Sequence, residues 1–95
     1  MTNGKVRVLV ADDEPLARER LRTLLAPEEW LEVVAECPTG TEAIEAIGRL
    51  EPDLVFLDVQ MPGASGFEVI EAVGPARMPL VVFVTAFDHY ALRAF

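Results

Sequence analysis

The stretch that most constrains the fold is a short apolar run, residues 54–57, which lies between Asp53 and Asp58. Four large apolar residues are too few for a buried helix, and Pro52 just upstream is a natural break. The run therefore predicts a strand buried on both faces, as in a parallel sheet covered by helices. In open sheets of this kind ligands bind at the carboxyl ends of the strands, and Asp58 is the first polar residue beyond that end. We expect the chemistry of this chain at Asp58.

Two other apolar runs end in the same way. Residues 6–11 stop at Asp12 and Asp13, and residues 80–84 stop at Thr85. If the strands are parallel, their carboxyl ends meet at one edge of the sheet. Three acids and a hydroxyl are then expected to lie together there.

Helical patterns separate the predicted strands. Pro15 suits the first turn of a helix, and the leucines of that helix, at positions 16, 21, 24 and 25, recur on one face. A shorter strand is expected at residues 31–35, with Cys37 and Pro38 as its exit.

Two capping-box patterns mark the next helices. Thr39 with Glu42 precedes one helix, and Ser65 with Glu68 precedes another. The first helix is expected to bury Ala43, Ile44, Ile47 and Leu50. The second is expected to bury Phe67, Ile70 and Val73. A last helix is expected from Asp88 to the end of the sequence. The order βαβαβαβα predicts an α/β fold with right-handed crossovers around an open parallel sheet.

Composition limits the class of protein. The chain has 95 residues, 52% hydrophobic and 25% charged, which predicts one globular domain spanning residues 1–95. A net charge of -8 argues against direct binding to nucleic acid, because phosphate backbones require clustered Lys and Arg. No apolar run approaches the roughly 18 residues of a membrane span, and a lone cysteine agrees with a reducing compartment, so we expect a cytoplasmic protein.

The acids at the predicted sheet edge suggest metal chemistry. Taken singly, each is as well explained by a helix cap or a turn. Together, with no basic residue near them in the sequence, they would repel one another unless a cation lay among them. An all-oxygen site suits Mg²⁺ or Mn²⁺, which would allow Asp58 to act as a nucleophile toward a phosphoryl group and Thr85 to donate a hydrogen bond to it.

At this point the residues resemble a known family. Val-Leu-Val-Ala-Asp-Asp-Glu-Pro at 8–15, Asp-Leu-Val-Phe-Leu-Asp-Val-Gln-Met-Pro-Gly at 53–63 and Val-Thr-Ala at 84–86 are similar to the motifs of response-regulator receiver domains. The segments that begin at Asp12 and Thr85 further resemble the receivers of LytTR-type regulators, in which a DNA-binding domain follows the receiver.

The resemblance implies a CheY-like, flavodoxin-like three-layer α/β/α fold and a two-component phosphorelay. It implies a sensor histidine kinase as phosphodonor, Asp58 as acceptor, and Mg²⁺ bound directly by Asp13, Asp58 and the Gln60 carbonyl, with Asp12 acting through water. Thr85 matches the hydroxyl that contacts the phosphoryl group. Such a domain is not an enzyme beyond self-phosphorylation and slow autodephosphorylation.

The family pattern continues beyond this sequence. It places a lysine and a proline at the end of a fifth strand that carries an aromatic switch residue, whereas this sequence stops at Phe95. Lys5 precedes the first strand and lies at its wrong end to substitute. We therefore expect a truncated receiver with strand order 2-1-3-4, an exposed fourth strand at 80–84 and a bare sheet face over the first and third strands. We expect weak phosphorylation, and either poor stability or self-association, including homodimers.

Three alternatives remain open. A haloacid-dehalogenase-like phosphatase needs a second acid two residues after its nucleophile, where this chain has Gln60. A dinucleotide-binding half-domain needs a glycine-rich first turn, where this chain has Asp12 and Asp13. An interaction module could keep the fold without phosphorylation.

Other residues that attract attention have ordinary explanations. Trp30 is expected to anchor the core, Cys37 to be a loop thiol and His89 to be an exposed residue at a helix start.

Overall fold

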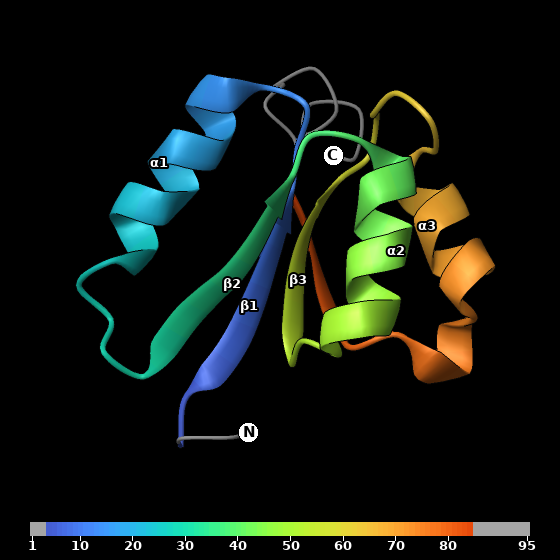
Figure 1. Cartoon of the computed structure of the whole chain (residues 1–95). Coiled ribbons are helices and arrows are strands. Elements are labelled where there is room, and N and C mark those ends of the chain that lie inside the picture. Colours follow the sequence, from blue (N-terminus) through green and yellow to red (C-terminus); the bar gives the residue numbers. More distant parts are fainter. Residues whose placement is uncertain (1–3, 85–95) are drawn as a thin grey trace, which may run out of the picture.

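The computed structural model describes residues 4–84, which form a four-stranded sheet with helices on both faces (Figure 1). The elements in chain order are β1 (Val6–Ala11), α1 (Pro15–Leu25), β2 (Leu31–Cys37), α2 (Gly40–Leu50), β3 (Leu54–Asp58), α3 (Gly66–Val73), the 3-10 helix η1 (Pro75–Arg77) and β4 (Leu80–Val84). The predicted last helix lies outside the described residues. Within residues 4–84, no helix is both long and apolar enough to cross a bilayer.

All strand pairs are parallel, and the strand order is β2-β1-β3-β4. This is the open α/β sheet expected from the sequence. Ala11 pairs with Leu57 and Asp58 pairs with Val84, so that the ends of the three strands are aligned. The residues that follow β1 therefore lie beside the last residue of β3.

Side-chain caps fix where α2 and α3 begin. The Thr39 hydroxyl accepts a hydrogen bond from the Glu42 amide at 3.1 Å. Ser65 and Glu68 form a complete capping box, with Glu68 N to Ser65 Oγ at 3.1 Å and Ser65 N to Glu68 Oε1 at 2.8 Å. Both predicted starts are confirmed, because these side chains satisfy amides that the first helical turn leaves unpaired.

The core lies between the sheet and the pair α2 and α3, which cover the same face in Figure 1. It contains the following buried residues: Leu9, Ala11, Cys37, Ala43, Ala46, Ile47, Val55, Leu57 and Val69. Phe67, expected to point inward from α3, is 60% exposed, and Val69 is buried in its place. The apolar residues of α3, at 67, 69, 70 and 73, do not all fit one helical face, so their spacing alone does not decide between Phe67 and Val69.

Helix α1 lies on the opposite face of the sheet (Figure 1), next to β1 and β2. Val8 and Val10 are fully buried, yet α1 itself has no buried residue, and Leu16 and Leu24 are 62% and 71% exposed. The leucines expected on one face of this helix therefore do not all pack in the core. Periodicity identified a shared face, but within residues 4–84 no second helix packs beside α1 to cover it.

Strand β4 forms one edge of the described sheet, as expected. Its Leu80, Val82 and Phe83 are 75%, 44% and 42% exposed. The exposed apolar surface was expected over the first and third strands, but Val8 and Val10 of β1 are buried. The bare surface thus belongs mainly to β4.

Two further expectations are corrected by the structure. Trp30 is 57% exposed and donates its indole N–H to Glu28 Oε1 at 3.0 Å, so it is not a core anchor. Strand β2 extends two residues further than predicted, so Cys37 is its buried last residue rather than a loop thiol. Burial raises the pKa of the Cys37 thiol to about 11, which keeps it protonated and unreactive.

Candidate functional site

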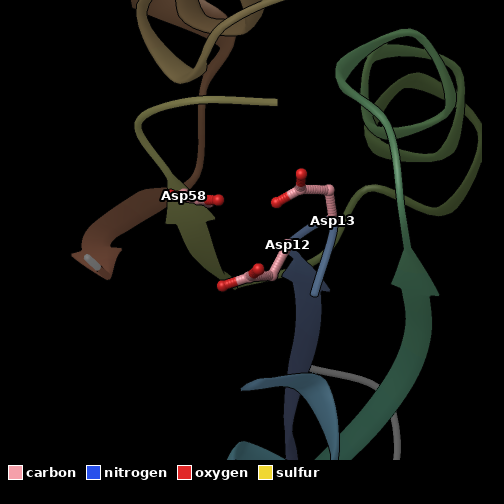
Figure 2. Close-up of side chains that lie close together, drawn as sticks. All are labelled: Asp12, Asp13 and Asp58. Atoms are coloured by element: carbon pink, nitrogen blue, oxygen red, sulfur yellow. The ribbon is translucent and has the colours of Figure 1, made fainter. Parts of the chain in front are cut away.

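Three carboxylates meet where β1 and β3 end. Asp12 and Asp13 directly follow β1, and Asp58 is the last residue of β3. Each contributes an oxygen to a group whose atoms all lie within 4.8 Å of one another. Figure 2 shows the three side chains converging on the space between the two strand ends. We call Asp12, Asp13 and Asp58 the acidic cluster.

Asp12 is the buried member of the cluster, with 2% of its surface exposed. Its Oδ1 accepts a hydrogen bond from the Glu14 amide at 2.9 Å, whereas its buried Oδ2 has no hydrogen-bond partner among the described residues. Burial, opposed by the Glu14 bond and reinforced by the charge of Asp13, raises the pKa of Asp12. A buried carboxylate oxygen without a partner is costly, so a bound cation would stabilise it.

Asp58 is half-buried, and its pKa is raised to about 6. Burial is the largest cause, followed by the negative charge of Asp12, and the Gln60 amide opposes both by donating a hydrogen bond to Asp58 Oδ1 at 3.4 Å. A carboxylate held in this way is more basic than an ordinary aspartate. A nearby cation would return it to the ionised form needed for nucleophilic attack.

The loop after β3 is tied closely to the site. The Gly66 amide donates to the Val59 carbonyl at 2.9 Å, and a Cβ on Gly66 would come within 2.5 Å of the Asp58 carbonyl oxygen. The Gly40 amide donates to the Pro62 carbonyl at 2.9 Å, which joins the loop to the start of α2. The loop that carries Gln60 is therefore positioned from both sides by backbone contacts that only glycine allows.

The acidic cluster fits a divalent metal ion. Its ligand atoms are all carboxylate oxygens, the type that Mg²⁺ and Mn²⁺ prefer. Gln60 lies in the loop beside the cluster, where its amide binds Asp58 Oδ1. The unpartnered Oδ2 of Asp12 is an independent sign that the cluster is incomplete without a cation. The structure thus brings together Asp12, Asp13 and Asp58 as predicted.

One cation near the cluster was missed by the sequence reasoning. Arg18, in the first turns of α1, donates its Nη1 to the Asp12 carbonyl oxygen at 2.7 Å. The acids therefore have a basic neighbour in space, although the sequence around them suggested none. The available signal was Pro15, because a helix starting there carries Arg18 back toward the end of β1.

The remaining predicted site residue, Thr85, lies outside the described residues. Lys5 lies before β1, at the end of the strand opposite to the acidic cluster, as expected.

Comparison with known families accounts for this arrangement of acids on a parallel sheet. The response regulator receiver domain family matches residues 8–95. The chain belongs to this family. Receiver membership explains why Asp58 lies beside Asp12 and Asp13 although it is distant from them in the sequence.

Individual relatives agree with the family. The chain is 51% identical over 90 residues to the transcriptional regulatory protein BtsR of Salmonella typhi, covering 95% of this chain and 38% of BtsR. It is 54% identical over 90 residues to an uncharacterized response regulatory protein of Yersinia pestis, with the same coverage of 95% and 38%. The chain thus spans well under half the length of these relatives.

Solved structures confirm the receiver fold. The signal receiver domain of the putative response regulator NarL from Mycobacterium tuberculosis superposes with a TM-score of 0.80 at 39% identity, over 93% of this chain and 72% of that one. The CheY-like strand order β2-β1-β3-β4 and the flanking helices match this fold.

Proposed function

We propose that this receiver domain accepts a phosphoryl group on Asp58 from a sensor histidine kinase, with Mg²⁺ in the acidic cluster, as part of a cytoplasmic response regulator. The convergence of Asp12, Asp13 and Asp58 at the ends of β1 and β3 is the observation that carries the proposal. Family membership supports it.

In this proposal Asp13, Asp58 and the Gln60 carbonyl would hold the metal, and Asp12 would act through water. When present, Mg²⁺ neutralises negative charge on the cluster and on the incoming phosphoryl oxygens. The unpartnered, buried Oδ2 of Asp12 supports a role for this residue as an acceptor that orients water. Removing the charge of any of the three acids should weaken metal binding.

Asp58 is the nucleophile. Its carboxylate oxygen attacks the phosphorus, a new oxygen–phosphorus bond forms, and the bond to the imidazole nitrogen of the phosphodonor breaks with its electron pair remaining on that nitrogen. The product is an acyl phosphate on Asp58. The Thr85 hydroxyl, which follows β4 in the sequence, would donate a hydrogen bond to a phosphoryl oxygen.

The signal would pass to a LytTR-type DNA-binding domain in the full-length protein. The motifs after Asp12 and Thr85 support this assignment, as does the similarity to BtsR, a transcriptional regulatory protein. The receiver itself would not be an enzyme beyond self-phosphorylation and slow autodephosphorylation. Gln60, an amide where a haloacid-dehalogenase-like phosphatase needs a general acid, argues against rapid turnover.

An interaction module that keeps the fold without efficient phosphorylation is the second candidate. The exposed apolar residues of β4 favour it, because such an edge can pair with another chain.

A Mg²⁺ titration separates the two candidates. Calorimetry on the wild type and on Asp13→Asn should show saturable binding that the substitution weakens strongly, with Asp53→Asn, at the opposite end of β3, as a charge-matched control. Equal heats for the wild type and Asp13→Asn would remove the metal site from the proposal and leave the interaction module.

A further inference from the structure

Arg18 connects helix α1 to the loop that carries two of the three acids. Its Nη1 donates to the Asp12 carbonyl oxygen at 2.7 Å, and its side chain is only 19% exposed. The same loop is held by the Asp12 amide, which donates to the Cys37 carbonyl at 3.0 Å. The backbone of Asp12 is therefore fixed from β2 through its N–H and from α1 through its C=O.

The guanidinium of Arg18 is itself held in place by β2. Glu36 Oε1 lies 3.9 Å from Arg18 Nε, and Arg22 Nη1 binds both oxygens of Glu36 at 2.9 and 2.8 Å. Arg22 lies one turn further along α1 than Arg18, and the Arg22 side chain is 52% exposed. Glu36 thus orients Arg18 and neutralises part of its charge.

We propose that Arg18 is a positioning residue, which holds the loop between β1 and α1 so that the carboxylates of Asp12 and Asp13 face Asp58. This inference rests on the proposed function, in which the acidic cluster binds Mg²⁺. Arg18 touches neither the metal nor the phosphoryl group in this account. It acts through the peptide carbonyl of Asp12, as outer partners of metal sites commonly do.

The sign of the effect distinguishes positioning from simple charge. A cation near three carboxylates repels Mg²⁺, so removing it should tighten metal binding if charge alone mattered. Loss of the hydrogen bond should instead weaken binding, because the loop would no longer be held in the binding geometry. We expect the second effect to dominate, because the bond to Asp12 is short and the Arg18 side chain that makes it is only 19% exposed.

The test compares Arg18→Gln, Arg18→Lys and the control Arg22→Gln, each first checked for cooperative thermal unfolding. Calorimetry then gives the Mg²⁺ affinity. Both Arg18 variants should bind Mg²⁺ about tenfold more weakly than the wild type, because lysine keeps the charge but cannot reproduce the planar fork of arginine. Arg22→Gln should bind like the wild type.

A second readout needs no metal. The Glu14 amide donates to Asp12 Oδ1, so its hydrogen exchange in metal-free protein reports on the order of the loop. Exchange should be faster in both Arg18 variants and unchanged in Arg22→Gln.

Tighter or unchanged Mg²⁺ binding by Arg18→Gln would overturn the proposal, as would full affinity in Arg18→Lys. Failure of the wild type to bind Mg²⁺ would instead defeat the proposed function. In that case unchanged exchange at Glu14 would also defeat the positioning role.

Discussion

The carboxylate of Asp12 lies beside that of Asp58 and helps to raise its pKa to about 6 (Figure 2). Burial is the larger cause, and the two effects together make the metal-free site a source of instability at neutral pH. A cation bound in the acidic cluster of this chain would relieve that instability.

Replacing Asp58 with asparagine should stabilise the metal-free protein at pH 7. The pKa of Asp58 is higher in the folded state than its ordinary value, so the folded protein binds more protons between about pH 4 and pH 6. The ionised carboxylate of Asp58 therefore destabilises the folded wild type above about pH 6, and this destabilisation is lost as the pH falls below that value. We expect Asp58→Asn to gain on the order of 1 to 2 kcal/mol at pH 7, after allowance for solvent screening of a partly exposed group.

Urea unfolding with a chelator present, at pH 7 and again near pH 4.5, measures this effect. The difference between Asp58→Asn and the wild type should shrink at the lower pH, and saturating Mg²⁺ at pH 7 should reverse it. A variant that is less stable than the wild type at pH 7 without metal would contradict the assigned electrostatics.

Replacing either of two glycines of α2 with alanine should change the stability of the protein, in opposite directions at the two positions. A Cβ at Gly40 would clash with the Ala64 carbonyl in the loop after β3, so Gly40→Ala should lower the free energy of unfolding by at least about 1 to 3 kcal/mol. A Cβ at Gly48 would meet nothing within 4 Å, so Gly48→Ala should gain about 0.5 to 1 kcal/mol through helix propensity. Thermal and urea unfolding of the pair provide the measurement, and equal effects at both positions would show that the loop does not pack on α2 as described.

The exposed edge of β4 should drive self-association. Val82 is 44% exposed on a strand that pairs only with β3 within residues 4–84. A lysine there should oppose edge pairing, because it places a charge on the surface that a second copy would cover. Light scattering across a concentration series should show association of the wild type that Val82→Lys reduces and that Thr23→Lys, an equal change in charge on exposed α1, does not. A wild type that remains monomeric at high concentration would contradict the expectation.

Much of the fold could be predicted because local signals agreed with one another. The apolar runs before Asp12 and Asp58, the caps at Thr39 and Ser65, and the proline at the start of α1 each identified an element correctly. Parallel strands then brought the acids together without any long-range information.

The rest depended on contacts that a single sequence does not encode. The leucine spacing of α1 shows which residues share a face but not whether another element covers them, and Leu24 proved exposed. Trp30 was misplaced for the same reason. Arg18 was missed because its partner is the backbone carbonyl of Asp12, which no residue type specifies, and the helix start at Pro15 was the only indication that Arg18 returns toward the acids.

Phosphoryl transfer to Asp58 tests the central claim most directly. Incubation with acetyl phosphate and Mg²⁺, followed by borohydride reduction and peptide mass spectrometry, locates any acyl phosphate, with Asp58→Ala and a chelator-treated sample as controls. The account predicts one modified residue, Asp58, in the wild type with Mg²⁺, and none in either control. Labelling that persists in Asp58→Ala, or sustained hydrolysis of the phosphodonor without a labelled Asp58, would contradict it.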